Sequence, residues 1–239
     1  MKTLVYSTVL AISIMLSSCY LGNGQLGIRG EGPVVERKIE LKTIEGISLS
    51  GSAKVFLTQG KTQEVKIEGQ ENIIDNLNLE VSGEVWDIGN KRSVWQSEEV
   101  KIYITMETLR LIKVSGSGDI EFVNHFEGDK DLEIRISGAG KINLDMDADD
   151  ISGNISGSGD LYMKGKANSL DFSITGSGNI AGYELITKKA DVRISGSGGM
   201  DITVEDHLDA HITGSGSIHY KGDPKVNSSV TGSGSVRSR

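Results

Sequence analysis

Carboxylates and basic side chains recur at fixed places in this sequence, and together they could act on an acidic polysaccharide. Asp171, Asp191 and Asp209 share one repeated position, and the position two residues later holds Arg193 and His211. Carboxylates can bind Ca²⁺ while a basic group removes a proton. Serine or asparagine interrupts these columns at Ser152, Ser173, Asn227 and Ser229, so we interpret the charges as pairs across an exposed sheet. We expect no catalytic residue, and an enzyme remains the weaker alternative.

Two other groups could bind a metal ion. The acidic run between residues 145 and 150 contains Asp145 and Asp147 and could bind Ca²⁺, but calcium-binding repeats need an aspartate in every copy, and most copies here lack one. We therefore expect a solvated loop. His207 and His211 are four residues apart, a metal-binding spacing on a helix, but on a strand they lie ~13 Å apart. The sequence predicts no metal ion and no cofactor.

Three aromatic residues are candidate contacts for a glycan: Trp86, Trp95 and Tyr103. An exposed aromatic ring offers an apolar face with a polar edge, against which a sugar ring can stack. The alternative is that these rings pack as a cap over the first coil of the fold. All three lie in the less regular part of the chain, before residue 110.

The elements that position these groups come from a repeat. The tripeptide Gly-Ser-Gly, with one Gly-Ala-Gly variant, recurs every 18 to 22 residues, always after Ser or Thr. Its first glycine stands at Gly116, Gly138, Gly157, Gly176, Gly196, Gly214 and Gly232. Apolar residues stand two positions before and four positions after this glycine. An alternation of period two predicts strands with one buried face, joined at a glycine corner, and we expect both glycines to point inward.

A repeat of this length cannot bury its apolar face alone, so successive copies must stack. Equivalent residues would then lie ~4.8 Å apart in columns. The sequence predicts an all-β solenoid with serial Gly-Ser-Gly corners. Upstream, a weaker corner at residues 50–53 predicts one further coil, followed by a strand at 64–68, a helical turn at 71–76, a hairpin at 77–88 and a strand at 101–106.

The N-terminus has the pattern of an exported lipoprotein. A short positive start precedes an apolar run, Leu4 to Leu16, which ends in Leu16-Ser17-Ser18-Cys19. This pattern is typical of a bacterial signal peptide at residues 1–18, with lipid attached to Cys19. We expect residues 19–35, which are rich in glycine, to form a flexible tether and residues 36–239 to form the solenoid domain. The predicted location is the outer membrane, facing the surface or the periplasm.

Composition restricts the possible partners. The formal net charge of −8 argues against nucleic acid, because phosphate binding needs a basic face. Glycine is abundant, with 31 residues, but proline is rare, with 2, so the glycines separate strands rather than mark a disordered chain. The last coil would have an open edge, which makes a homo-oligomer possible.

The chain resembles the auto-transporter adhesin head domain called the GIN domain, over roughly residues 36–239. The resemblance rests on Val114-Ser115-Gly116-Ser117-Gly118-Asp119-Ile120, on Gly140-Lys141-Ile142-Asn143-Leu144 and on the serial corners. It implies a right-handed β-helix-like fold without the catalytic residues of pectin lyases, and a role in adhesion. We expect a non-enzymatic surface or envelope protein that adheres to a host or envelope glycan or protein, or serves as a scaffold. The alternative is a glycan-binding module that uses the N-terminal aromatic residues.

Overall fold

Each Gly-Ser-Gly unit forms a sharp corner in the computed structural model, which describes residues 27–128 and 130–239. The first glycine of each unit has a φ of 117–131°, a backbone conformation that L side chains rarely adopt. The second glycine is buried in every unit except the last, where Gly234 is half-buried, and the first glycine is exposed or half-buried at the corner itself. The prediction that both glycines point inward is therefore wrong for the first one, because the chain turns at that residue. A Cβ on Gly176 would meet the backbone of Gly157 in the preceding coil, whereas a Cβ on Gly178 would meet the core side chain of Ile155.

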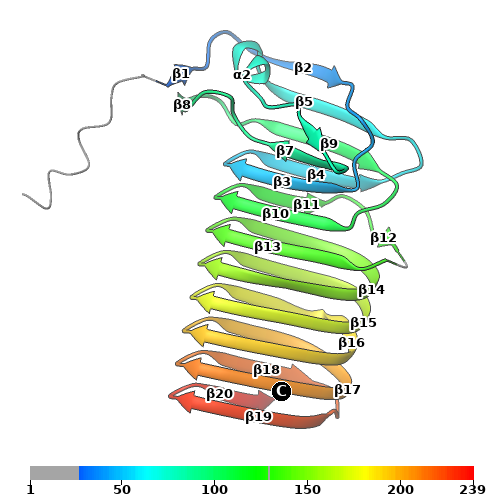
Figure 1. The fold of residues 1–239 in the computed structure, drawn as a ribbon, viewed down its shortest axis with the longest axis vertical. Coiled ribbons are helices and arrows are strands. Elements are labelled where there is room, and N and C mark those ends of the chain that lie inside the picture. Colours follow the sequence, from blue (N-terminus) through cyan, green and yellow to red (C-terminus); the bar gives the residue numbers. More distant parts are fainter. Residues whose placement is uncertain (1–26, 129) are drawn as a thin grey trace, which may run out of the picture.

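The strands stack into a β-solenoid of about seven coils, wound in a right-handed sense (Figure 1). The irregular part contains β1 (Ile28–Arg29), β2 (Val34–Ile39), β3 (Gly46–Gly51), β4 (Lys54–Gln59), β5 (Glu64–Gln70), α2 (Glu71–Asp75), β6 (Val81–Ser82), β7 (Val85–Ile88), β8 (Val94–Gln96) and β9 (Lys101–Met106). The regular coils contain β10 (Leu111–Gly116), β11 (Asp119–Phe122), β12 (Phe126–Glu127), β13 (Leu132–Gly138), β14 (Lys141–Gly157), β15 (Asp160–Gly176), β16 (Asn179–Gly196), β17 (Gly199–Gly214), β18 (Ser217–Lys221), β19 (Lys225–Gly232) and β20 (Ser235–Ser238).

Each coil contributes one strand to each of two sheet faces. The first sheet contains β5, β9, β4, β11, the N-terminal halves of β14–β17, β18 and β20. The second sheet contains β7, β3, β10, β13, the C-terminal halves of β14–β17 and β19. The long strands β14–β17 bend from one sheet into the other, and the glycine corners join the sheets on the opposite side (Figure 1).

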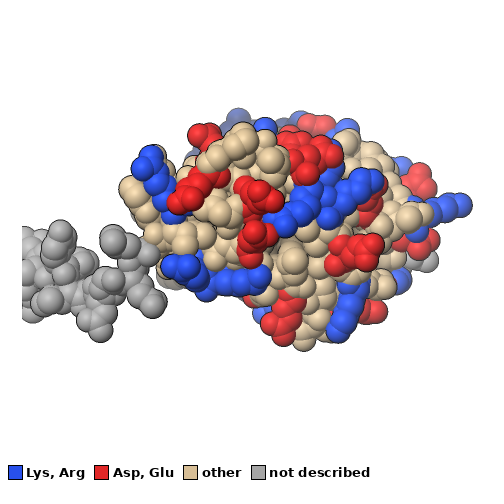
Figure 2. Space-filling model, turned by 90° about the horizontal axis from the view of Figure 1, so that it is seen from above, with Lys and Arg blue, Asp and Glu red and all other residues tan. Residues whose placement is uncertain are grey.

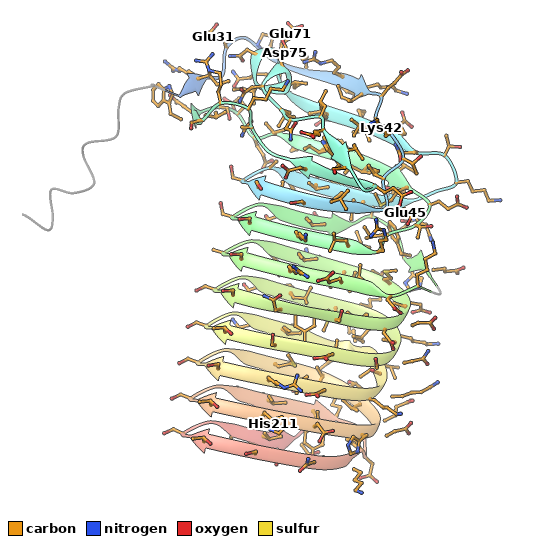
Figure 3. All side chains as sticks on the ribbon, in the orientation of Figure 1. Glu31, Lys42, Glu45, Glu71, Asp75 and His211 are labelled. Atoms are coloured by element: carbon orange, nitrogen blue, oxygen red, sulfur yellow. The ribbon has the colours of Figure 1, made fainter. Side chains whose placement is uncertain are left out.

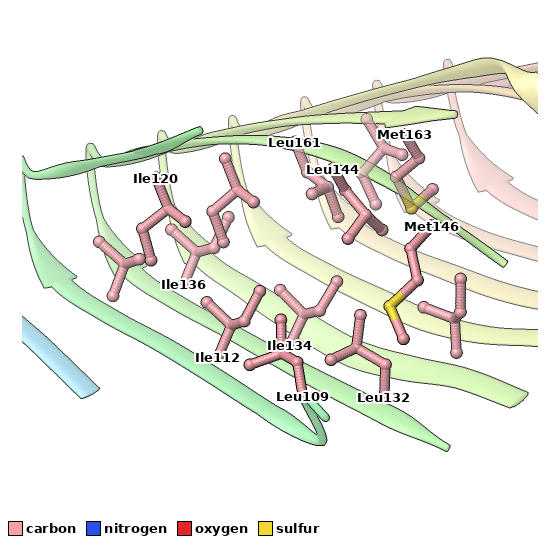
Figure 4. Packing of buried hydrophobic residues seen from close by; sticks show 14 of the residues in the cluster. Leu109, Ile112, Ile120, Leu132, Ile134, Ile136, Leu144, Met146, Leu161 and Met163 are labelled. Carbon is pink, nitrogen blue, oxygen red and sulfur yellow. The ribbon is translucent and has the colours of Figure 1, made fainter. Parts of the chain in front are cut away.

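The predicted stacking of equivalent residues is confirmed. Ile155 pairs in parallel with Ile174, Ile174 with Ile194, and Ile194 with Ile212. All four are at most 2% exposed. Figure 4 shows the same arrangement in earlier coils, where side chains from both sheets meet in one interior. Burying each such side chain contributes roughly 1.5–3 kcal/mol, so stacking supplies the core that a single coil lacks.

The irregular part covers the N-terminal end of the solenoid. Strand β2 pairs antiparallel with β5, which pairs antiparallel with β9, and α2 buries Ile73 and Ile74. The predicted strand, helical turn and hairpin are confirmed as β5, α2 and the antiparallel pair β6–β7. Seen from this end, acidic and basic side chains alternate over the surface (Figure 2). Three salt bridges cross it, between Arg37 and Asp75, Lys66 and Glu36, and Lys38 and Glu64.

The tether predicted for residues 19–35 differs from the structure in its described part. Ile28–Arg29 forms β1, which pairs with β8, and Val34 begins β2. The folded part therefore begins before residue 36. The predicted signal peptide and Cys19 lie outside the described residues. Among the residues that are described, no helix has the length and hydropathy needed to span a bilayer.

The C-terminal end of the solenoid has a different surface. Strand β19 pairs with β17, and all its residues are exposed. Val226 and Val230 continue the core columns of Leu208 and Ile212, yet they are 37% and 41% exposed. The apolar interior thus reaches the surface along the outer edge of β19.

Candidate functional site

A hollow in the described surface lies beside Trp95. It has a volume of about 660 Å³ and separates the first corner, residues 50–53, from the segment that contains β8. In Figure 1 this region lies at the upper left, between the ends of β8 and β3. It is lined by Ser50, Gly51, Ser52, Ala53, Ile73, Leu77, Ile88, Gly89, Asn90, Val94, Trp95, Gln96, Ser97, Glu98, Glu99 and Val100.

Trp95 is held open to solvent at the rim of this cleft. Its side chain is 63% exposed, and the Arg29 guanidinium lies 5.7 Å from the ring centroid. Pairing with β1 fixes the strand, since the Ile28 amide donates to the Ser93 carbonyl at 2.8 Å and the Gly30 amide to the Gln96 carbonyl at 2.8 Å. A fixed indole can stack on a ring without losing much side-chain entropy.

The walls of the cleft combine apolar and polar groups. Ile73 and Leu77 are buried and form an apolar floor. Glu98 and Glu99 add carboxylates, which can accept hydrogen bonds, and the Glu98 amide donates to Gln70 Oε1 at 3.0 Å. An aromatic ring beside acceptors for hydroxyl groups is the chemistry that recognises a sugar.

The structure corrects the prediction for Trp86. Its side chain is 0% exposed, and its indole Nε1 donates to the Asn78 carbonyl at 2.9 Å. It lies in β7, where it pairs with Ile47 of β3 and faces the core. A buried ring cannot contact a ligand that arrives from solvent, so Trp86 packs under the cap. This was the alternative interpretation of the aromatic residues.

Tyr103 is half-buried on the first sheet, at a different place from Trp95. Its ring stacks on Phe56 with centroids 4.9 Å apart and planes at 11°, and the Lys66 ammonium lies 4.8 Å from its centroid. The hydroxyl donates to Glu68 at 3.2 Å. Burial, followed by the charge of Glu68, raises the pKa of Tyr103 above 10.0. The stack explains why Phe56, an apolar residue, occupies an outward position.

The predicted charge pairing on the second sheet is confirmed for Asp171 and Asp191. Arg193 binds Asp191 at 2.7 Å and Asp171 at 3.5 Å. Asp209 instead accepts hydrogen bonds from Asn227 at 2.8 Å and interacts with His207 at 2.9 Å, and these contacts lower its pKa. His207 lies on the same strand, β17, as His211, which Figure 3 labels.

The acidic run at residues 145–150 belongs to β14, so the prediction of a loop is wrong. Its side chains bind partners on neighbouring coils. Asp145 contacts His125 at 2.7 Å and Lys164 at 3.4 Å, and Asp150 accepts from the Ser169 hydroxyl at 2.6 Å. Stacking supplies these partners, which a loop would lack. In the described residues no group of three or more His, Cys, Asp or Glu side chains could hold a metal ion.

The sequence indicated Trp95 but not the cleft around it. The lining comes from segments more than 40 residues apart, the corner at 50–53 and residues 94–100, which meet because β4 pairs with β9. The polar run after Trp95, which contains neither a corner nor a regular alternation, was the only sign of an irregular surface there.

Comparison with known proteins gives relatives with the same fold. The solved structure of a "putative adhesin" from Bacteroides fragilis is 25% identical to this chain, with a TM-score of 0.83. The match covers 89% of this chain and 100% of that one. A "putative adhesin" from Parabacteroides distasonis is 25% identical over 89% and 99% of the two chains, with a TM-score of 0.73. A "putative lipid binding protein" from the same species is 28% identical over 89% and 99%, with a TM-score of 0.70.

No curated protein matches the chain. A family model, by contrast, matches residues 43–224, which is most of the chain and includes the first corner and nearly all of the regular coils. Its match agrees with the resemblance seen in the corners and with the solenoid itself. The chain belongs to the family described as "Putative auto-transporter adhesin, head GIN domain".

Proposed function

We propose that this protein is a non-enzymatic adhesion or scaffold protein, anchored to the cell envelope by lipid on Cys19. The observation that carries the proposal is the stack of coils itself, a rigid rod with one continuous core and two broad sheet faces. Such a rod displays surface far from an anchor at its N-terminal end. The adhesin-like family and its structural relatives agree with this role.

Anchoring is tested at Cys19. In cells fed a palmitate analogue that can be labelled, the wild-type protein takes up label and stays in the membrane fraction. Cys19→Ala loses both properties because the acyl chains supply the membrane affinity. Protease treatment of intact cells then distinguishes surface display from a periplasmic orientation. Label retained by Cys19→Ala would overturn the lipid anchor.

Adhesion is tested with intact cells. We expect a strain without the protein to attach less to glycan-coated or protein-coated surfaces, and the wild-type chain, but not a form that stays inside the outer membrane, to restore attachment. Equal attachment with and without the protein would overturn adhesion. A loss of envelope integrity in the deletion strain, without a change in attachment, would favour the scaffold role.

A second candidate function is that of a glycan-binding module. The cleft beside Trp95 supports it, because the exposed indole stands next to carboxylate, amide and hydroxyl groups that can bind sugar hydroxyls. On a glycan array, Trp95→Ala should abolish binding. Val123→Ala, which changes another side chain that is 60% exposed, should leave it intact. Binding that survives Trp95→Ala would exclude this cleft as the glycan site.

A further inference from the structure

Outward aromatic side chains of the solenoid gather on the first sheet. Phe56, Tyr103 and Tyr162 occupy outward positions of β4, β9 and β15, and Tyr183 lies at the bulge of β16 beside that sheet. Most outward positions of the second sheet carry serine, threonine, asparagine, histidine or charged residues, and none among the described residues carries an aromatic. The two faces therefore differ in the ligands they can recognise.

Each of these aromatic rings has a lysine over its face. The ammonium groups lie 4.4–5.1 Å from the ring centroids, within the range of a cation–π contact. The pairs are Lys54 with Phe56, Lys66 with Tyr103, Lys141 with Tyr162, and Lys221 with Tyr183. A ring beside a cation offers both stacking area and a positive charge.

A groove opens on this sheet where the outward side chains become small. Tyr162, which is 43% exposed, is followed in its column by Ala181 and then Asp201. The neighbouring column has Gly199 between Asn179 and Ser217. Hollows of about 560 Å³ and 320 Å³ result, and both are lined by Ala181 and Tyr183. The two hollows therefore adjoin at these two residues, and together they are called the groove.

Two basic side chains line the end of this groove near the last coils. Lys221 lies 4.4 Å from the Tyr183 ring centroid, and Arg239 also lines this hollow. The carboxylate there, Asp201, is already bound by His219 at 3.0 Å. Within the described residues neither Lys221 nor Arg239 has an ion-pair partner within 4.0 Å. These two basic side chains are therefore available to an acidic ligand, on a chain whose formal net charge is −8.

Tyr183 can take part as a neutral phenol. Burial, and next the neighbouring Asp201 carboxylate, raise the pKa of Tyr183 above 10.0, so its hydroxyl keeps its proton at neutral pH. The backbone around the groove is fixed, since the Arg239 amide donates to the Tyr220 carbonyl at 2.9 Å and the Thr203 hydroxyl to the Tyr183 carbonyl at 2.8 Å.

We propose that this groove binds an acidic polysaccharide, with a uronate carboxylate at Lys221 and Arg239 and sugar rings against Tyr183 and Tyr162. Coils are ~4.8 Å apart, so the column from Tyr162 to His219 spans ~14 Å, which suits an oligosaccharide rather than a single sugar. The Lys221 and Arg239 side chains supply the charge-assisted hydrogen bonds that select a carboxylate. The groove is separate from the cleft beside Trp95 and does not depend on the function proposed for that cleft.

Calorimetric titration of the purified protein with oligogalacturonate tests the proposal, with neutral galactan oligomers as the comparison. We expect binding of the acidic oligomer only, weakened by salt. Lys221→Ala and Arg239→Ala should each weaken it about tenfold, which corresponds to about 1.4 kcal/mol. Ala181→Trp, which places a large ring in the groove at an exposed position, should abolish it while circular dichroism stays unchanged.

Lys113→Ala is the matched control, because it removes the same charge from the second sheet. Binding equally weakened by Lys113→Ala and Lys221→Ala would overturn the proposal in favour of unspecific attraction. Equal affinity for the neutral oligomer would overturn carboxylate recognition, and binding that survives Ala181→Trp would exclude the groove. Trp95→Ala should leave the affinity for oligogalacturonate unchanged. The titration therefore tests binding in this groove separately from glycan binding in the cleft beside Trp95.

Discussion

Gly176 lies directly on Gly157 in the stack of corners, so closely that a Cβ on Gly176 would come 2.5 Å from the Gly157 carbonyl oxygen. The same relationship recurs at the successive corners, with distances of 2.3–2.7 Å from Gly116 to Gly232. The amide of the residue after Gly176, Ser177, donates to that same carbonyl at 2.8 Å. The corners are therefore close-packed backbone, with a φ of 118° at Gly176.

Gly176→Ala should destabilise the protein by at least about 2 kcal/mol, because the positive φ and the backbone contact both oppose a Cβ. The measurement is chemical denaturation followed by circular dichroism. Ser177→Ala, one residue later on an exposed side chain, is the control and should stay within about 0.5 kcal/mol. Equal stability of the two variants would contradict the close packing of the corner.

Ile174→Ala should lower the free energy of unfolding by about 2–5 kcal/mol. The side chain is 1% exposed and lies in the column between Ile155 and Ile194, so its removal leaves a cavity between coils. Its exposed neighbour Thr175 gives the matched variant Thr175→Ala, for which we expect little change. A small change in the free energy of unfolding for Ile174→Ala would show that this column contributes little to the stability of the core.

Asp145 should make stability depend on acid pH. Burial alone would raise the pKa of its carboxyl, but hydrogen bonds from His125 and Lys164 outweigh burial and hold the pKa below 3.8. A carboxyl with a lowered folded pKa stabilises the fold above its unfolded pKa, and this contribution is lost as the pH falls through the folded value. The affected window therefore lies below about pH 4.

Asp145→Asn should then cost up to about 1 kcal/mol at pH 7, as for a pair near the surface, and should make the acid loss of stability less steep. Denaturation midpoints measured between pH 7 and pH 2 check this. Asp206→Asn, at an exposed position, serves as the control. Parallel pH profiles for Asp145→Asn and the wild type would argue against a stabilising role of the His125 and Lys164 contacts.

The outer edge of β19 should support self-association. Its exposed Val226 and Val230 continue the core columns, and an edge strand can pair with a second copy. In light scattering we expect the apparent mass of the purified protein to rise with concentration. V226K/V230K should stay monomeric because lysines block edge pairing, whereas V123K, changed at a distant exposed valine, should behave as the wild type. A constant monomer mass for the wild type would rule out this dimer.

The repeat by itself determined the fold. The glycine spacing and the period-two alternation around residues such as Ile174 predicted the strands, the corners and the register, because a strand with one apolar face must stack when each repeat is too short to bury it. The sequence also predicted the short turn at α2 and the hairpin, through local propensity.

Tertiary structure alone decided which candidates are accessible. Trp86 and Trp95 stand nine residues apart in similar surroundings, yet one is buried under the cap and the other is 63% exposed. The difference depends on long-range pairing of β7 with β3 and of β8 with β1, which local pattern does not encode. The hollows of the first sheet likewise depend on neighbouring coils. The small side chain of Ala181 leaves a hollow because the larger Tyr162 stands next to it in the stack.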